Sequence, residues 1–525
     1  MSRNPYDRNP YDEVAYDSPP HSETRPENLY RVASLFGFEA ADFVTARVLE
    51  LGCAAGSNII PLAAQYPKAT FVGIDYSQKQ IESGKQHIDN LQLKNIRLDC
   101  ASIVDMGPEY GKFDYIIAHG VYSWVPDEVR DHVMRVCKQQ LDLQGIALVS
   151  FNTYPGWKAV SNVRELMLMH TKNIDDPIKK AAEARKIVSF VKKNVPGENS
   201  PWAQELQMEI DGPNFNQDYY ILHDYLEENN CPVYFKDFMR HVKQHDLDYL
   251  TDLEFTTRSP YCLTGDAKKM ILEKSDVTDA EQYLDFIINR RFRRALICHQ
   301  GIPKSREVTT KLFDRYKISS RLKAVTQCTT ENLTDSTSLL FESDQLDVES
   351  DEPLLKAALH YLGEKNGAIK WEKLVEYLGK EFPTFSKDVI NEKLNALNFE
   401  ELMILHAVDL SLGSAVSSHT LTAKPKASDF ARYQTKFSTS LTNLKHRQVD
   451  MDQLSCLIMP LLDGKNTIQE IVKLFKKKMK TADIDEIEIA AEDGLQSYTK
   501  EIILDNAKYI VNEYIKQLAK QDFLH

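Results

Sequence analysis

The sequence predicts an α/β fold built on an open, mostly parallel sheet of seven strands with helices between them. Three observations support this fold. Short β-rich runs alternate with helical patterns through the first 300 residues, a glycine turn from Gly52 to Gly56 follows the first run, and an acidic residue, Asp75, ends the second. The chain has 525 residues, more than one hydrophobic core normally serves, so we expect about two to four domains.

The turn between the first strand and the first helix carries the strongest signal. Val48 to Leu51 is an apolar run, and Ile59 to Gln65 has the apolar spacing of a helix packed on a sheet. Glycine lets the backbone turn sharply and approach a ligand, and the following helix offers unpaired N–H groups. Thr70 to Ile74 then forms a second β-rich run that ends in Asp75, a carboxylate suited to binding two ribose hydroxyls. Turn and acid together predict a nucleoside-binding site.

The residues of the turn distinguish two classes of cofactor. A dinucleotide fingerprint reads GxGxxG, whereas Glu50 to Gly56 reads ELGCAAG and resembles the ExGxGxG pattern of class I S-adenosylmethionine (SAM) methyltransferases. Ala54 stands where that pattern prefers glycine. The resemblance implies a Rossmann-like core, SAM as cofactor and S-adenosylhomocysteine as product. It assigns cofactor contacts to Glu50, Gly52, Cys53, Ala54, Gly56, Asn58, Asp75, Tyr76 and Ser77.

The third and fourth expected strands lead to further candidates. Ile96 to Ala101 reads as a strand, and the resemblance implies that Ser102 and Ile103, which follow it, contact the adenine. Lys112 to Gly120 has the acidic start and apolar body of the fourth strand, and His119 near its end is a candidate for cofactor contact and for proton acceptor.

Aromatic residues follow the fourth and fifth strands. Ligands of open α/β sheets bind at the carboxyl ends of the strands, so we expect these residues near the transferable methyl group. The fifth strand, Gly145 to Phe151, continues into NTYPGW, where a Pro-Gly turn carries aromatic rings able to wall a slot for an alkyl-ammonium chain. The candidate catalytic residues are His119, Tyr122, Trp124, Asn152, Tyr154 and Trp157. Ordinary packing is the alternative for Tyr122 and Trp124, and a lid without substrate contact is the alternative for the turn.

A helical segment separates the last two expected strands from the fifth strand in the sequence. Lys158 to Val195 and Asn216 to His245 are helical in pattern, whereas Leu247 to Thr257 and Arg293 to His299 have strand character. We therefore expect a core domain over residues 1–300 with a helical insertion at about 158–246, and we expect the two late strands to complete the sheet.

Four strings extend the resemblance over nearly all of the chain. The string beginning NFNQDYYILHDYLEENN at Asn214 resembles the methyltransferase regulatory domain, and the strings from Pro20, Phe151 and Asn289 fit the same family. The chain is most similar to the rickettsial protein-lysine methyltransferases that act on outer membrane protein B. This similarity implies a lysine ε-amine as methyl acceptor, a protein substrate and a homodimer, with the insertion in a regulatory or dimerisation role. A SAM-dependent enzyme for a small metabolite and a SAM-binding regulator without turnover are the alternatives.

The same similarity implies that the N-terminal segment folds over the cofactor, and Tyr16 and Arg25 are the candidates for that contact. A mobile tail is the alternative.

The C-terminal half carries no chemical motif. We expect a middle domain over residues 301–425 with α+β character and a winged-helix-like part, with the acidic stretch Glu342 to Glu352 as a linker, and a mostly helical domain over residues 426–525. Binding and presentation of an extended protein substrate is the role that we expect of these domains.

Composition limits the classes of substrate and binding partner that we expect for this protein. The net charge of -13 argues against a nucleic-acid substrate and favours lysine-rich partners. The 8 cysteines are scattered without metal-ligand spacing, so we expect reduced thiols, no metal and a cytoplasmic protein. No run is long enough to cross a bilayer, and the N-terminus lacks the apolar core of a signal peptide, so we expect no membrane insertion.

Overall fold

The computed structural model describes residues 19–525 except 198, 255–262, 264, 306–312, 314–315, 321, 344–346, 366, 397–407, 412–420, 483–485 and 492–493. Its contacts divide the chain into two compact units, which are described separately. One contains Pro26–Gly52 and Ala101–Gly413, and the other contains Asp17–Arg25, Cys53–Cys100 and Ser414–His525. No helix within the described ranges is both long and apolar enough to cross a membrane.

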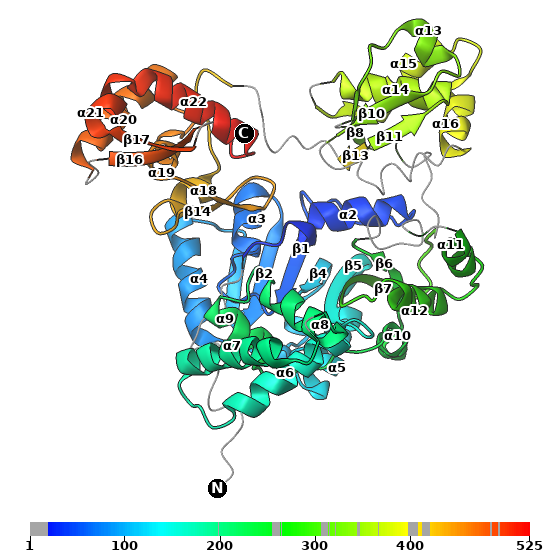
Figure 1. Cartoon of the computed structure of the whole chain (residues 1–525), viewed down its shortest axis with the longest axis vertical. Helices are drawn as coiled ribbons and strands as arrows, with labels where there is room; N and C mark the ends of the chain where they lie inside the picture. The colour runs from blue at the N-terminus through cyan, green and yellow to red at the C-terminus, as the bar shows by residue number, and fades with distance from the viewer. Residues whose placement is uncertain are drawn as a thin grey trace. The chain divides into compact units, whose positions relative to one another are not determined.

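Seven strands form one sheet in the order β3-β2-β1-β4-β5-β7-β6 (Figure 1). Pairs β2–β3, β1–β4 and β4–β5 are parallel, and β7 pairs antiparallel with both β5 and β6. The predicted fold and the completion of the sheet by the two late strands are confirmed. The strands are β1 (Arg47–Leu51), β2 (Thr70–Asp75), β3 (Ile96–Cys100), β4 (Phe113–Ala118), β5 (Leu141–Asn152), β6 (Leu247–Asp252) and β7 (Phe292–His299).

Helices follow the strands of this sheet in sequence. Local sequence explains their starts, because Ser77 caps α4 by accepting from the N–H of Gln80 and Asp276 caps α12 by accepting from that of Thr278. The helices are α2 (Pro26–Leu35), α3 (Ile59–Gln65), α4 (Gln78–Leu91), α5 (Asp127–Gln140), α10 (Phe235–Gln244), α11 (Gly265–Leu272) and α12 (Val277–Ile287).

A helical block lies between β5 and β6 in sequence, where the insertion was expected. Asp176 and Ser200 cap two of its helices, and a proline follows each cap at the first helical position. Buried side chains such as Val163, Ala184 and Leu206 give the block a core of its own. Its helices are α6 (Trp157–Thr171), α7 (Pro177–Asn194), α8 (Pro201–Ile210), α9 (Asp218–Tyr220) and the π-helix η4 (Ile221–Tyr225).

The middle part of the chain combines two small antiparallel sheets with helices. Its sheets have the orders β11-β10-β9 and β12-β8-β13. The prediction of a linker over Glu342 to Glu352 is wrong, because β11 pairs antiparallel with β10. Strand pairing uses the backbone, and the acidic side chains of β11 stay exposed or half-buried. The elements are β8 (Lys317–Ser320), β9 (Lys323–Ala324), α13 (Thr330–Thr334), β10 (Leu339–Glu342), β11 (Asp347–Ser350), α14 (Pro353–Gly363), β12 (Ile369–Lys370), α15 (Trp371–Glu381), α16 (Lys387–Ala396) and β13 (Val408–Ser411).

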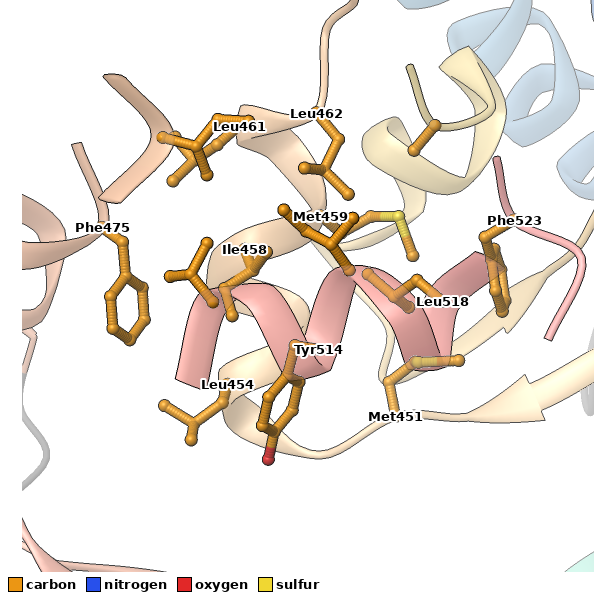
Figure 2. Packing of buried hydrophobic residues seen from close by; sticks show 14 of the residues in the cluster. Met451, Leu454, Ile458, Met459, Leu461, Leu462, Phe475, Tyr514, Leu518 and Phe523 are labelled. Atoms are coloured by element: carbon orange, nitrogen blue, oxygen red, sulfur yellow. The ribbon is translucent and has the colours of Figure 1, made fainter. Parts of the chain in front are cut away.

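The C-terminal part packs helices and two hairpins around one apolar core. In Figure 2, Tyr514 and Leu518 project from the last helix among Leu454, Ile458 and Met459. The two hairpins, β14–β15 and β16–β17, give this part more strand than the mostly helical prediction had. The elements are α18 (Asp429–Gln434), β14 (Ser440–Thr442), β15 (Gln448–Asp450), α19 (Gln453–Ile458), η7 (Met459–Leu461), α20 (Ile468–Thr481), β16 (Glu486–Ala491), β17 (Gly494–Thr499), α21 (Lys500–Asp505) and α22 (Ala507–Lys520).

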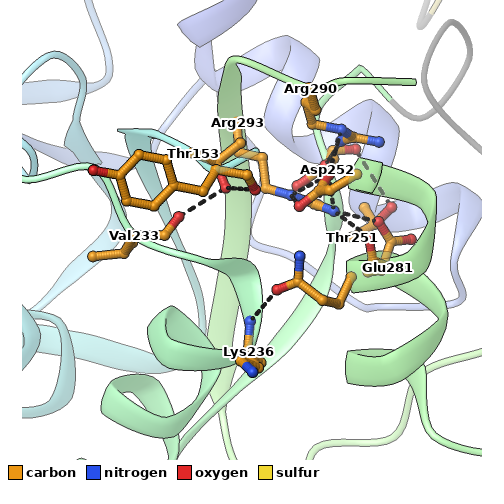
Figure 3. A network of polar contacts seen from close by, with 11 residues as sticks. Thr153, Val233, Lys236, Thr251, Asp252, Glu281, Arg290 and Arg293 are labelled. Carbon is orange, nitrogen blue, oxygen red and sulfur yellow. Dashed lines mark hydrogen bonds and ion pairs between the residues drawn. The ribbon is translucent and has the colours of Figure 1, made fainter. Parts of the chain in front are cut away.

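A buried ionic network joins β6, β7 and α12. Arg293 is fully buried, and its guanidinium donates to Asp252 at 2.5 Å, to Asp285 at 3.0 Å and to Glu281 at 2.9 Å (Figure 3). Burial opposes its charge, yet the three carboxylates raise the pKa of Arg293 well above its usual value. Arg290 also pairs with Asp285, at 2.8 Å.

This network holds the segment that supports the loop after β5. The N–H of Thr153 donates to the carbonyl of Arg291 at 2.9 Å, and that of Gly156 donates to the carbonyl of Arg290 at 3.0 Å. A Cβ at Gly156 would lie only 2.3 Å from the carbonyl oxygen of Asn289, so the close approach requires glycine. The conformation of the NTYPGW loop therefore depends on the residues at the start of β7.

The variant Arg293→Met tests this dependence. Removing the guanidinium leaves Arg290 as the one network cation beside the buried Asp252 and Asp285, and we expect the free energy of unfolding to fall by about 3–5 kcal/mol. Urea unfolding measures the loss. Arg97→Met is the control, because Arg97 pairs with Asp99 on the surface and a pair of that kind contributes about 0–1 kcal/mol. Equal losses in the two variants would contradict the role of the network.

Candidate functional site

The turn after β1 has the geometry that its glycines predicted. Gly52 and Gly56 have φ of +70° and +77°, in the left-handed region. A Cβ at Gly52 would lie 2.7 Å from Cγ2 of Val121, so a side chain there would clash. The turn continues with the N–H of Cys53 donating to the carbonyl of Ile74 at 3.1 Å, and it leads into α3. The chain thus presents backbone N–H groups at the start of a helix, as a cofactor site of this class requires.

Ala54 adopts a left-handed conformation, with φ of 48°. This conformation costs an L-residue about 1–2 kcal/mol, which explains why the pattern prefers glycine here. The N–H of Ala54 donates to Oδ2 of Asp75 at 2.8 Å, and the N–H of Ser77 donates to Oδ1 at 2.8 Å. Asp75 therefore organises the turn through both of its oxygens.

Asn58 is held by protein groups on all sides of its amide. Its Oδ1 accepts from the N–H of His21 at 3.0 Å, and its Nδ2 donates to Oγ1 of Thr24 at 3.0 Å. Nε2 of His446 also donates to Oδ1, at 2.9 Å. Asn58 is 2% exposed and is held in place at the start of α3, and its direct contact with the cofactor stays a prediction.

His446 could not have been identified from the sequence. It lies 388 positions from Asn58 in the chain and is 1% exposed. Burial lowers its pKa well below the usual histidine value, so the ring is neutral and donates from a single nitrogen. Its φ of 62° is unusual for a residue with a side chain. His21 and Thr24 were likewise missed, because nothing in the string from Pro20 that contains them indicates their contacts with Asn58.

The remaining cofactor candidates differ in their environment. Arg25 is buried and donates to the Tyr66 hydroxyl at 3.0 Å, whereas Tyr76 is 52% exposed. Ser77 is buried as the cap of α4, and Glu50 is a buried carboxyl group on β1. Tyr16 lies outside the described residues.

The candidates after β3 and β4 belong to the other compact unit. Ser102 caps the short helix Ile103–Asp105 by accepting from the N–H of Val104 at 3.4 Å, so its hydroxyl is already engaged. His119 is half-buried after β4, and its ring lies edge-on to Phe292 with centroids 5.9 Å apart.

Tyr122 packs in the interior of its unit. It is 2% exposed, and its ring lies 5.5 Å from Phe238 and 6.0 Å from Phe151 between centroids. Its hydroxyl hydrogen-bonds Nδ1 of His241 at 2.8 Å, and burial raises the pKa of Tyr122 far above its usual value. This geometry favours the packing alternative over a substrate wall.

Trp124 and Trp157 come together as the sequence predicted. Their rings meet edge to face with centroids 6.3 Å apart, both are half-buried, and Nε1 of Trp157 donates to Oδ1 of Asn230 at 3.1 Å. The N–H of Asn152 donates to Oγ of Ser123 at 2.9 Å. Within the described part of the chain, the Nδ2 atoms of Asn152 and Asn230 meet no acceptor, so both amides have donors to offer a substrate.

Tyr154 shows that the loop can hold an ammonium group. Its ring centroid lies 5.3 Å from that of Tyr234. Nζ of Lys158 lies 5.8 Å from the Tyr154 centroid and 5.7 Å from the Tyr234 centroid. A lysine side chain of the protein itself thus lies at cation–π distance from this ring, and the predicted contact with a substrate ammonium group stays a prediction.

Comparison with known proteins identifies matches to three families. Residues 43–194 match a methyltransferase domain, residues 217–299 match the predicted methyltransferase regulatory domain, and residues 423–523 match the PKMT C-terminal winged helix domain. The last match covers the part predicted as mostly helical and is consistent with its added hairpins.

Two relatives match most of the chain. The uncharacterized protein RP789 of Rickettsia prowazekii is 34% identical over 478 residues, which cover 90% of this chain and 85% of that protein. The structure of PKMT2 from Rickettsia typhi in complex with AdoHcy matches with a TM-score of 0.82 at 29% identity, covering 97% of this chain and 99% of that one. The chain therefore belongs to the PKMT family of SAM-dependent methyltransferases, whose regulatory domain and C-terminal winged helix it shares.

Proposed function

We propose that this protein is a protein-lysine N-methyltransferase that transfers the methyl group of SAM to lysine ε-amines of a protein substrate. The observation that carries the proposal is the likeness over 97% of the chain to PKMT2 of Rickettsia typhi, a structure that contains AdoHcy. A surface or outer-membrane protein is the substrate class we propose, and a homodimer is the proposed assembly. Three expectations from the sequence stay predictions. They are that nucleic acid is not a substrate, that the protein is cytoplasmic, and that its domains have the boundaries given above.

The turn after β1 and the end of β2 are the proposed cofactor site. Asp75 is half-buried and accepts two backbone N–H groups, which preserves its negative charge and fixes its direction. The ribose hydroxyls of SAM are proposed to donate to this carboxylate. Glu50, Cys53, Ser102 and Ile103 keep their proposed places around it.

The lysine amine must lose its proton before it attacks. The reference pKa of lysine is about 10.4, but a neighbouring sulfonium and exclusion of water both disfavour the ammonium form. In-line attack needs the amine about 3–3.5 Å from the methyl carbon, so positioning is the main contribution of the protein. Trp124, Tyr154 and Trp157 are proposed to hold the alkyl stem, and His119 is the proposed proton acceptor if solvent does not serve.

The amides of Asn152 and Asn230 are proposed to orient the acceptor. Asn152 is 2% exposed and is the last residue of β5, where it pairs with Phe292 of β7. An unpaired buried N–H costs free energy until an acceptor arrives, and a substrate backbone carbonyl is a suitable acceptor. The middle and C-terminal domains are proposed to bind the rest of the protein substrate.

Transfer of tritium from labelled SAM tests the proposed function. We expect label in lysines of a recombinant lysine-rich outer-membrane protein and none in a metabolite extract. Asp75→Ala should abolish transfer and SAM binding by calorimetry, since it removes the acceptor that holds Ala54 and the ribose, whereas the exposed Asp89→Asn should change neither. Label only in the metabolite extract would instead support a small-molecule methyltransferase.

Trp157→Ala separates acceptor binding from cofactor binding. Loss of the indole removes one wall of the lysine slot, and we expect kcat/KM for the protein substrate to fall roughly 10- to 100-fold with unchanged SAM affinity. Trp157→Phe keeps an aromatic ring and should recover much of the activity. A loss of SAM affinity equal to the loss of turnover would reject this division of roles.

His446→Ala tests whether the C-terminal part supports the cofactor turn. Removal of the donor to Asn58 costs about 1 kcal/mol, which corresponds to roughly a five-fold weaker SAM affinity. Calorimetric titration with SAM measures this change. The exposed Gln448→Ala, in the same hairpin, is the control and should bind normally. Unchanged affinity in both variants would limit His446 to a role in packing.

A further inference from the structure

Two histidines and an aspartate converge at a point where α5 faces α10. His241 and His245 are one helical turn apart at the end of α10, and Asp131 projects from α5. Oδ1 of Asp131 lies 2.8 Å from Nε2 of His245 and 3.4 Å from Nε2 of His241. The three ligating atoms all lie within 4.8 Å of one another. The proposed catalytic steps use none of these three side chains.

The spacing suits a small divalent cation. Zn²⁺ binds histidine nitrogen and carboxylate oxygen at about 2.0–2.2 Å, and its tetrahedral ligands are then about 3.3 Å apart. The contacts of 2.8 and 3.4 Å bracket this separation, so small side-chain rotations suffice. The side chains of His245, His241 and Asp131 are 15%, 20% and 35% exposed, which leaves solvent access for the ion and for a water as fourth ligand.

The surrounding groups orient the ligands as they do in metal sites. A ligating histidine usually hydrogen-bonds through its other ring nitrogen, and Nδ1 of His241 meets the Tyr122 hydroxyl at 2.8 Å. The second oxygen of Asp131 pairs with Nε of Arg135 at 2.8 Å. A ligating carboxylate is commonly held in this way.

We propose that Asp131, His241 and His245 form a binding site for a divalent transition metal of the Zn²⁺ class, with Tyr122 and Arg135 as orienting groups. Nε2 of a neutral His241 ring would hold the ion, and the single proton of that ring would sit on Nδ1, where the Tyr122 hydroxyl at 2.8 Å would accept it. Although burial opposes it, hydrogen bonds from the two histidines keep the pKa of Asp131 below its usual value.

The site would tie together two matched domains. Asp131 lies within residues 43–194, the methyltransferase match, and the histidines lie within residues 217–299, the regulatory match. A metal bridge between α5 and α10 would also fix Tyr122, which follows β4 in the part of the chain that we propose binds the acceptor. The ion is therefore structural, and it binds without taking part in methyl transfer.

The test uses the full-length protein. EDTA first strips any bound metal from the protein, and the EDTA is then removed by dialysis. Titration with Co²⁺ alone, followed by visible absorption, and with Zn²⁺ alone, followed by calorimetry, should show one equivalent bound and a rise in Tm. His245→Gln and Asp131→Asn should each lose this binding, and Tyr122→Phe should weaken it about 10- to 100-fold. His170→Gln is the control, because His170 lies 3.8 Å from Glu183 and belongs to no group of three possible metal ligands among the described residues.

Each outcome supports or overturns the proposed metal site, and none of them depends on methyltransferase activity. Binding that is lost in His245→Gln and Asp131→Asn and kept in His170→Gln supports the site. No binding by the wild-type chain, or binding that all variants retain, overturns it. Circular dichroism and Tm of the metal-free variants, which we expect to match the wild type, exclude misfolding as the cause of a loss.

Discussion

The fully buried Arg293 is the constraint on which much of its unit depends. It neutralises acidic groups from β6 and α12, and its ring neighbour Phe235 on α10 lies 4.0 Å beneath the guanidinium. An isolated charge could not remain in this interior, so the carboxylates and the arginine are required together. Because the adjacent carbonyls of Arg290 and Arg291 accept from the loop after β5, the same cluster sets the position of Tyr154 and Trp157.

In the cofactor turn, hydrogen bonds compensate for a strained backbone conformation. Ala54 occupies a conformation that glycine would adopt more easily, and Asp75 offsets that cost by accepting its N–H. Asn58 extends the arrangement, because two separate segments, residues 21–24 and the hairpin turn at His446, reach its amide. A residue far along the chain, His446, thereby becomes part of the support for the first helix after the turn.

Much of this architecture was predictable because it rests on local patterns. Strand periodicity located all seven strands, and the glycine turn with Asp75 identified the methyltransferase class. The acidic stretch around Asp347 was misjudged, since an exposed hairpin strand pairs through its backbone and tolerates charged side chains. Tyr122 was expected among the substrate contacts, but its position in the chain could not reveal that its hydroxyl meets His241 on α10.

The sequence by itself determined the fold class, the cofactor motif and the membership of the PKMT family, because each is written in residues that are neighbours in the chain. Only the tertiary structure decided which side chains meet. Asp131, His241 and His245, like Asn58 and His446, come from distant segments, and folding brings them within hydrogen-bonding distance. Their contacts arise from helix packing and loop geometry, whose outcome depends on the whole chain and not on local spacing.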